Sequence, residues 1–417
     1  MKRYKILLIL FALPLCIYAI WISLRHKEYR FLKERFGLIR NNPIKSTIWF
    51  HAASVGEVNA VMPLINLMKR KCPDTHVCLT TNTPTGSRIA HKTRPDNVEV
   101  FYLPFDYSFC NRLFLKRLQP VCALIMETEI WPDLYKACHN KNIPLLIING
   151  RISERTLNVS DWIKQLYATT LSYTDGILAR SDTDRTNYVA LGANPEKVEV
   201  IGNLKFSQAT VTSATLTEIT RPFILAASTR ENEELIILEC FRKTLSQNKL
   251  LVIAPRHPHR TMEILNDLDK PGLNIAIRSR HDPVTEDTHV YLADTIGELG
   301  KFISEAEFVF MGGSLVPRGG QNILEVARAG KAVIFGPYMD NFKDEAQLLI
   351  DAGAAIQVSS ADELLKQITF LQNNPGKLQE MASSGLQIME QYKNMHERYL
   401  QAISERIPAT RSLCYKS

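Results

Sequence analysis

The sequence predicts an α/β protein with two doubly wound, Rossmann-like domains that face a cleft, preceded by an N-terminal membrane anchor helix. Two observations predict the domains: past residue 45 short apolar runs alternate with helical patterns, and the same rhythm restarts after a polar stretch at 207–220. Apolar runs separated by helices are typical of parallel sheets covered on both faces. A third observation predicts the anchor, since residues 6–24 carry no charge and lie between two basic clusters.

The length and composition fit a multidomain globular protein. The chain has 417 residues, of which 45% are hydrophobic and 22% charged, and this length favours two or three domains. The eight cysteines show no CxxC or His/Cys ligand spacing, so we expect no paired disulfides and a reducing compartment. We divide the chain into an anchor with a basic amphipathic segment (1–40), a first α/β domain (41–210), a second (211–395) and a C-terminal tail (396–417).

The anchor segment holds the whole formal charge excess of the chain. Residues 1–40 contain nine Lys or Arg and two acidic residues, which accounts for the net charge of +7. The body is therefore electrically balanced, which argues against nucleic acid as a partner and favours an anionic membrane surface. Residues 6–24 are long enough to span a hydrocarbon core. No small-residue cleavage site follows them, which disfavours a signal peptide.

We therefore predict an uncleaved anchor with the body on the cytoplasmic side, where clustered Lys and Arg usually lie. Whether the anchor spans the bilayer or inserts in its plane stays open, because Pro14 is compatible with both. The next stretch places Phe31, Leu32 and Phe36 among basic residues. This pattern predicts a basic amphipathic helix suited to lipid headgroups.

Strands are expected wherever short apolar runs occur. In the first half these runs are residues 47–51, 76–80, 98–103, 121–126, 144–149 and 176–180. In the second half they are residues 222–228, 249–255, 273–279, 308–312 and 332–336. Doubly wound domains bind ligands beyond the carboxyl ends of their strands, so the loops that follow these runs are where chemistry is expected.

Two such loops in the first half carry carboxylates. Glu57 lies in the first turn of a helix that follows residues 47–51, where the helix dipole should favour its ionised form and where it could accept a proton from an attacking hydroxyl. Ser54 and Glu57 equally fit a capping box with no catalytic role. Glu127 and Glu129 are expected on one face of an extended segment. Like-facing carboxylates there need cations or sugar hydroxyls, which favours a functional role.

The second half offers a candidate phosphate site in GGSLVPRGGQNILEVARAG (312–330). Its glycines follow a strand and precede a helix that Asn322 opens, and free amide groups at a helix start attract phosphate. Glu325 could accept hydrogen bonds from a ribose diol, although Asn322 and Glu325 also resemble a capping box. Arg256 directly follows another strand and could pair with a phosphate. Ser228 starts a further helix, where ordinary capping is the alternative.

Several other chemistries lack their motifs. No paired aspartates stand in a loop as divalent-metal ligands, and His257 and His259 have no third zinc ligand nearby. The chain has no GxGxxG, no GxxxxGK[ST] and no GxSxG motif, which weakens the dinucleotide, P-loop NTPase and serine-hydrolase interpretations.

Longer strings in a fixed order point to a family. They are HAASVGE (51–57), TTNTPTG (80–86), METEIWPDL (126–134), INGRIS (148–153), GNLKF (202–206), PRHPHR (255–260), DTIGEL (294–299), MGGSLVPRGGQNILE (311–325) and NFKDE (341–345). With these strings the chain resembles the 3-deoxy-D-manno-octulosonic acid (Kdo) transferases of Gram-negative bacteria, which have the GT-B glycosyltransferase fold. The resemblance runs from the anchor to about residue 360.

The resemblance implies an inverting transfer of Kdo from CMP-Kdo to lipid A precursor (lipid IVA) in lipopolysaccharide inner-core biosynthesis. It places the reaction at the cytoplasmic face of the inner membrane, among its phospholipids, with no cofactor and no required metal. It favours Glu57 as the general base, and it assigns the acceptor to the first domain and CMP-Kdo to the second.

The resemblance also implies two groups of site residues. The acceptor or cleft group is Ser54, Glu127, Glu129, Arg151 and Lys205. The CMP- or phosphate-binding group is Ser228, Pro255, Arg256, Gly297, Glu298, Gly319, Gly320, Asn322 and Glu325, with the glycines leaving room for the CMP phosphate. Many family members read GGHN where this chain reads GGQN, and Gln321 cannot become cationic as a histidine can.

Two alternatives from other classes remain. A nucleotide-sugar epimerase of the same fold would use a similar second domain and would act on a soluble sugar nucleotide without lipid. A tethered two-lobed ligand-binding protein would bind without turnover and would belong outside the cytoplasm.

Overall fold

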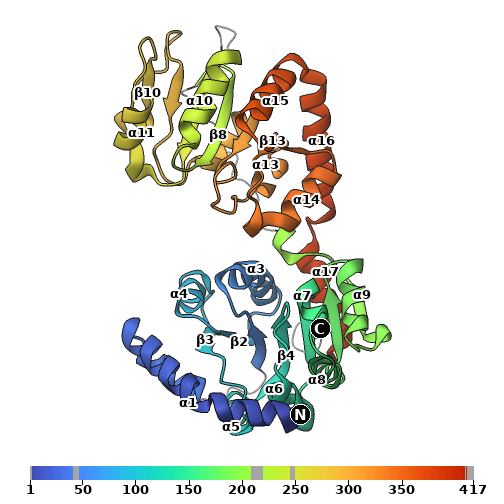
Figure 1. Cartoon of the computed structure of the whole chain (residues 1–417). Coiled ribbons are helices and arrows are strands. Elements are labelled where there is room, and N and C mark those ends of the chain that lie inside the picture. The colour runs from blue at the N-terminus through green and yellow to red at the C-terminus, as the bar shows by residue number, and fades with distance from the viewer. Residues whose placement is uncertain (1, 41–46, 208–218, 245–248, 409, 411–417) are drawn as a thin grey trace. The chain divides into compact units, whose positions relative to one another are not determined.

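The computed structural model describes residues 2–40, 47–207, 219–244, 249–408 and 410 (Figure 1). The chain divides into two compact units. Unit 1 comprises Met1–Gln208 and Asn394–Ser417, and unit 2 comprises Ala209–Lys393. The chain therefore returns to unit 1 at its end: the buried side of helix α17 (Met395–Arg406) includes Tyr399 and Ile403 and packs against α3 (Val55–Lys71). The stretch assigned from sequence to a separate tail (396–417) thus contains a helix that belongs to the core of unit 1.

Unit 1 is built on a seven-stranded parallel sheet with the order β3-β2-β1-β4-β5-β6-β7. Its strands are β1 (Thr47–His51), β2 (His76–Thr81), β3 (Val98–Tyr102), β4 (Pro120–Met126), β5 (Leu145–Gly150), β6 (Gly176–Ala179) and β7 (Val198–Val200). The remaining helices are α1 (Lys2–Arg25), α2 (Tyr29–Arg35), α4 (Pro84–Thr93), α5 (Ser108–Leu118), α6 (Pro132–Asn140), α7 (Glu154–Leu157), α8 (Asp161–Leu171) and α9 (Asp182–Ala190), with 3₁₀ turns η1 (Pro195–Lys197) and η2 (Leu204–Ser207).

Unit 2 repeats this plan with the parallel order β10-β11-β9-β8-β12-β13-β14. Its strands are β8 (Phe223–Thr229), β9 (Leu250–Pro255), β10 (Ile275–Ile277), β11 (Val290–Leu292), β12 (Phe308–Met311), β13 (Ala332–Phe335) and β14 (Ala355–Gln357). Its helices are α10 (Glu233–Thr244), α11 (Thr261–Asp267), α12 (Leu299–Glu305), α13 (Leu324–Arg328), α14 (Lys343–Asp351), α15 (Ala361–Asn373) and α16 (Pro375–Gln391), with η3 (Pro258–Arg260), η4 (Arg278–Arg280) and η5 (Asp340–Phe342).

The strand order decides which loops meet. In unit 1, β1 pairs with both β2 and β4, so the loops after these three strands lie at one edge of the sheet. In unit 2, β8 lies between β9 and β12, and β11 borders β9. The strands themselves are buried, as apolar parallel strands covered on both faces must be.

The N-terminal segment departs from the sequence prediction in one respect. Helix α1 forms as expected, and residues 3–25 are long and apolar enough to cross a membrane, with a mean hydropathy of 2.5 over their most apolar 18 residues. Helix α2, however, turns Phe31 and Arg35 into unit 1, where both are buried. The guanidinium of Arg35 donates to the carbonyl oxygen of Leu103 (2.5 Å) and to Asn82 (3.0 Å). These two residues therefore stabilise the unit and do not face lipid headgroups.

The cysteines also depart from the prediction. Cys72 is disulfide-bonded, although the spacing predicted no pairing. Six other cysteines in the described part of the chain are free thiols.

Candidate active site

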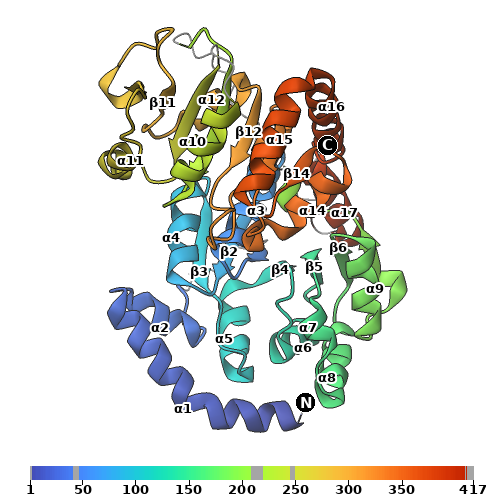
Figure 2. The same ribbon diagram turned by 45° about the horizontal axis from the view of Figure 1, so that its top comes forward.

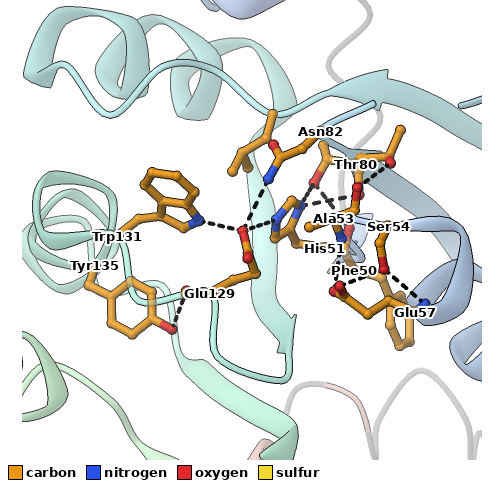
Figure 3. Close-up of polar contacts among 12 residues, drawn as sticks. Phe50, His51, Ala53, Ser54, Glu57, Thr80, Asn82, Glu129, Trp131 and Tyr135 are labelled. Carbon is orange, nitrogen blue, oxygen red and sulfur yellow. Dashed lines mark hydrogen bonds and ion pairs between the residues drawn. The ribbon is translucent and has the colours of Figure 1, made fainter. Parts of the chain in front are cut away.

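Glu57 is fixed at the start of α3, directly beyond the carboxyl end of β1 (Figure 3). The hydroxyl of Ser54 donates to Glu57 Oε1 (2.8 Å), and the backbone N–H of Ala53 donates to Oε2 (2.9 Å). Ser54 in turn accepts a longer bond from the Glu57 N–H (3.4 Å). Ser54 therefore caps α3 as the sequence allowed, with the reciprocal bond to Glu57 coming from the N–H of Ala53, one residue before the cap. These bonds hold the carboxylate in one orientation.

The electrostatics of Glu57 differ from the sequence expectation. The helix dipole was expected to favour the ionised form, but burial raises the pKa of Glu57 above its usual range, and the negative charge of Glu127 raises it further. The hydrogen bonds from Ala53 and Ser54 act in the opposite direction without cancelling this effect. Desolvation outweighs the dipole because the side chain is 8% exposed. A carboxylate with a raised pKa is a stronger proton acceptor.

Glu127 and Glu129 do not share one face of an extended segment, so that prediction was wrong. Glu127 has a φ of 53°, which turns the backbone sharply after β4. As a result Glu127 Oε1 lies 3.0 Å from Lys205 Nζ. The Glu129 carboxylate contacts other side chains. Each carboxylate thus meets its own cationic or hydrogen-bonding group, which removes the cost of placing two like charges together.

Glu129 is the centre of a hydrogen-bonded cluster (Figure 3). Its Oε2 accepts bonds from Asn82 Nδ2 (3.0 Å) and Trp131 Nε1 (3.0 Å), and it lies 3.4 Å from His51 Nε2. The other ring nitrogen of His51 lies 3.2 Å from the carbonyl oxygen of Thr80 and 3.0 Å from its hydroxyl. Burial acts to raise the pKa of Glu129, but the hydrogen bonds from His51, Trp131 and Asn82 outweigh it and hold the pKa below its usual range.

Sequence reasoning missed His51 and Asn82 as site residues. Both stand in strings that carried the family resemblance, HAASVGE and TTNTPTG. His51 ends β1, which pairs with β4, and Asn82 follows β2, which pairs with β1. That placement was the available signal. Arg151, by contrast, was expected in the site, yet its guanidinium is exposed and forms no hydrogen bond within the residues that the structure describes. Its carbonyl oxygen accepts a bond from the Thr128 hydroxyl (2.6 Å).

Unit 2 contains a pocket of about 120 Å³ at the carboxyl ends of its strands. Four residues that the resemblance assigned to CMP line it together, namely Ser228, Pro255, Arg256 and Gly297. The Arg256 side chain is exposed and has no hydrogen-bond partner among the described residues. This guanidinium is therefore available to an anionic ligand.

Glu298 lies beside this pocket, but other side chains already donate hydrogen bonds to its carboxylate. Arg278 donates two hydrogen bonds to its carboxylate (2.9 and 3.1 Å), and the Thr295 hydroxyl donates a third (2.5 Å). These bonds hold the pKa of Glu298 at about 2. The carboxylate therefore braces the loop that carries Gly297, and it is not itself among the pocket-lining residues.

The glycines of 312–320 have packing roles within unit 2. Gly319 and Gly320 have φ values of 79° and 74°, and a Cβ on either would collide with Asn341 or Met339. Their freedom is needed for close packing against η5. At the first glycine pair, the buried Glu233 carboxylate accepts the N–H groups of Gly313 (2.6 Å), Ser314 and Leu315. A side chain of the protein thus occupies amides that the sequence left for a phosphate.

Asn322 and Glu325 interact with each other. Asn322 Nδ2 donates to Glu325 Oε1 (2.8 Å), and Asn322 Oδ1 accepts the N–H of Leu324 (3.1 Å). Helix α13 starts at Leu324, two positions later than expected, because Asn322 holds a turn ahead of it.

The described residues offer no group of three or more His, Cys, Asp and Glu side chains that could hold a metal ion. His257, one of the two histidines considered for zinc, instead lies 2.6 Å from a guanidinium nitrogen of Arg230.

Two Rossmann-like units, each built on a seven-stranded parallel sheet, define the GT-B fold class. The chain has the fold of MurG from Acinetobacter baumannii (15% identity, 87% of this chain and 99% of that one, TM-score 0.56). It likewise has the fold of the UDP-GlcNAc 2-epimerase from Neisseria meningitidis (15% identity, 86% of this chain and 100% of that one, TM-score 0.58).

The sequence narrows this class to one family. A family model described as 3-deoxy-D-manno-octulosonic-acid transferase (kdotransferase) matches residues 30–208. The 3-deoxy-D-manno-octulosonic acid transferase of Haemophilus influenzae is 33% identical over 410 residues, which is 95% of this chain and 96% of that protein. The one of Bordetella pertussis is 32% identical over 382 residues, 87% of this chain and 88% of that protein. The chain belongs to the Kdo transferase family and is a glycosyltransferase. These relatives favour Kdo transfer over the two alternatives, the nucleotide-sugar epimerase and the ligand-binding protein.

Proposed function

We propose that this chain transfers Kdo from CMP-Kdo to lipid IVA in lipopolysaccharide inner-core biosynthesis, with inversion at the anomeric carbon and Glu57 as the general base. The names of its relatives support Kdo transfer. The observation that carries the base assignment is the environment of Glu57: a buried carboxylate at a strand end, held in one orientation, with a raised pKa.

In the proposed step, a lipid IVA hydroxyl loses its proton to Glu57 while its oxygen attacks the anomeric carbon of Kdo. The bond from that carbon to the phosphate oxygen breaks, and CMP leaves with the electron pair. Attack opposite the leaving group inverts the anomeric configuration. A carboxylate has about four lone-pair positions, and the bonds from Ser54 and Ala53 use two of them, so Glu57 retains capacity for the proton.

CMP-Kdo is proposed to bind unit 2, with its phosphate near Arg256 at the described pocket. A guanidinium matches two phosphate oxygens and would stabilise the charge that CMP gains as it leaves. We propose that no cofactor and no metal is required, and a chelator such as EDTA should therefore leave the transfer rate unchanged. The body is proposed to work at the cytoplasmic face of the inner membrane, attached through α1.

The test of this function is the product mass obtained from purified protein, lipid IVA and freshly generated CMP-Kdo. Wild type should add one or more Kdo units. Glu57→Gln should lose roughly 10²- to 10⁴-fold in rate, the usual contribution of a general base, while its amide can still complete the capping box. Glu363→Gln is a matched control, because Glu363 completes an equivalent box with Ser360 at the start of α15. A Glu57→Gln rate near wild type would reduce Glu57 to a helix cap, and no product from folded wild type would reject the reaction.

The pH dependence of the rate provides a separate check. Glu57 must be ionised to accept a proton, and its pKa is raised by burial and by Glu127. The rate should therefore fall with decreasing pH in a range above the ordinary carboxyl pKa of about 4.3. We would measure kcat/KM against pH, and an acid limb at or below that ordinary value would contradict the assignment.

A further inference from the structure

Helix α1 is fastened to unit 1 near both of its ends. The Tyr4 hydroxyl donates to Asp106 Oδ2 (2.6 Å), and the Tyr107 hydroxyl donates to the carbonyl oxygen of Leu8 (2.7 Å). Asp106 is itself buried and accepts the first N–H groups of α6. At the other end, Ala19 and Ile22 join a core cluster with Phe31, Tyr102 and Phe105. Figures 1 and 2 show α1, in blue, running past α5 along unit 1.

The remaining surface of α1 is apolar and exposed. Large hydrophobic side chains stand along most of its length, namely Ile6, Leu7, Ile9, Leu10, Phe11, Leu13, Ile17, Tyr18, Ile20, Trp21 and Leu24. A helix that is tied to a globular unit at both ends cannot run across a bilayer away from that unit. With its free side apolar, it is instead arranged to lie in the membrane plane.

A basic pocket adjoins the N-terminal end of this helix. It has a volume of about 350 Å³, roughly the space of ten water molecules. Its basic lining residues are Lys5 of α1, Arg112 of α5, Lys136 of α6 and Lys141, which follows α6. Asp133 is the one carboxylate among the lining residues. The Ser108 hydroxyl donates to Asp133 (3.1 Å).

The positive charge of this pocket exceeds its negative charge. Lys5, Lys136 and Lys141 form no ion pair with any residue that the structure describes, and Arg112 donates to a backbone carbonyl oxygen (3.2 Å). Four cations facing one occupied carboxylate repel one another unless an anion lies between them. A phosphate group provides the charge and the acceptor oxygens that such a set of donors requires.

We propose that this pocket binds the phosphate group of an anionic membrane lipid while α1 lies in the bilayer plane. The inference rests on the membrane attachment in the proposed function. A lipid is favoured over a soluble phosphate because Lys5 is followed directly by the exposed apolar residues of α1. Insertion of that side would bring the pocket to the headgroup level.

The headgroup site can be tested with the purified full chain and sedimented vesicles of phosphatidylcholine, with or without phosphatidylglycerol. Each lysine near an anionic surface contributes about a factor of five in affinity. Lys136→Gln/Lys141→Gln should therefore bind the anionic vesicles at least about tenfold more weakly and bind the neutral vesicles as wild type does. Lys270→Gln/Lys366→Gln removes the same charge from exposed positions of unit 2 and should change neither.

Other outcomes would overturn the proposal in distinct ways. If wild type binds no vesicles, the membrane attachment itself fails. If it binds them and the pocket variant is indistinguishable from wild type, only the headgroup site fails. If glycerol 3-phosphate raises the unfolding temperature of wild type but not of the pocket variant, and vesicle binding is equal, the pocket takes a soluble phosphate. The product-mass assay is independent of all three.

The orientation of α1 has its own test. A protease-cleavable tag is placed ahead of Met1 of the full chain, and inverted inner-membrane vesicles are treated with the protease. An in-plane helix leaves the tag and the body on the same accessible side, so cleavage is expected without detergent. Protection of the tag until detergent is added would mean that α1 spans the bilayer, and would overturn the in-plane arrangement.

Discussion

The Glu129 carboxylate joins side chains from several separate parts of unit 1. His51 ends β1, Asn82 follows β2, and Trp131 precedes α6. Asn82 extends the cluster to Arg35 of α2, whose pKa burial lowers to about 10. Hydrogen bonds to an ionised acceptor are stronger than those between neutral groups. One carboxylate therefore fixes the loops that surround the proposed base.

Replacing Glu129 by Gln should lower the free energy of unfolding by about 1–3 kcal/mol at neutral pH, because the amide cannot accept every bond of this cluster. The folded-state pKa is lowered, so the stabilisation is present above the ordinary pKa and disappears as the pH falls through the folded value. Urea unfolding at pH 7 and under acid conditions should show the difference from wild type shrinking. Glu196→Gln, at an exposed position, should stay within about 0.5 kcal/mol. A pH-independent difference would contradict this account.

At the residue scale, sequence patterns located side chains better than they predicted their partners. The meeting of Arg256 with Gly297 at one pocket follows from loops at the ends of the neighbouring strands β9 and β11. Lys205 and Glu127 pair although they follow β7 and β4, which are not neighbours but end at the same edge of the sheet. The turn at Glu127 and the capture of the Gly313 amide by Glu233 were not predicted. The first depends on one backbone dihedral angle, and the second joins residues 80 positions apart. Neither leaves a local pattern in the sequence.

At the scale of elements, strand length decided what the sequence revealed. In both units, strands were predicted wherever an apolar run is long enough to cross a sheet. The missed strands, β7, β11 and β14, have three residues each. β10 is equally short but was predicted, because it lies inside a longer apolar run at 273–279. Such short segments contain too few side chains for a pattern and exist because a neighbouring strand supplies their hydrogen bonds.

The loop between β12 and α13 gives a prediction at the same scale. Gly320 and Gly272 share a φ of 74°, but a Cβ at Gly320 would collide with Met339, whereas one at Gly272 meets nothing within 4 Å. Gly272→Ala should cost about 1–2 kcal/mol, the left-handed backbone penalty alone. Gly320→Ala should cost about 1–3 kcal/mol more, because it also overpacks the contact with η5. Chemical unfolding of the two variants measures the difference, and equal costs would show that packing does not explain this glycine.

At the scale of the whole molecule, the chain enters unit 1, builds unit 2 and returns. The return is made by α17, where the buried Tyr399 donates from its hydroxyl to the carbonyl oxygen of Gly202 (2.8 Å). Arg406 pairs with Glu199 (2.9 Å), and His396 lies 3.1 Å from the Ser207 hydroxyl. These contacts join residues 189–207 positions apart. A sequence pattern shows that this helix is amphipathic, but not which unit it covers.

This route through the chain makes the stabilities of the two units separable by single substitutions. Tyr399→Ala removes a fully buried ring from unit 1 and should cost that unit about 3–5 kcal/mol. Met381→Ala, in the buried side of α16, should cost unit 2 about 2–5 kcal/mol. Calorimetry of the full chain would be compared with that of residues 209–393 expressed alone, so that each unfolding transition can be assigned to a unit. This continuous segment should fold because it contains all of unit 2. Tyr399→Ala should lower only the temperature of the unit 1 transition, which the fragment lacks. Met381→Ala should lower only the temperature of the unit 2 transition, which the fragment and the full chain share. If Tyr399→Ala lowered the shared transition instead, α17 would stabilise unit 2, and the chain would not close back on unit 1.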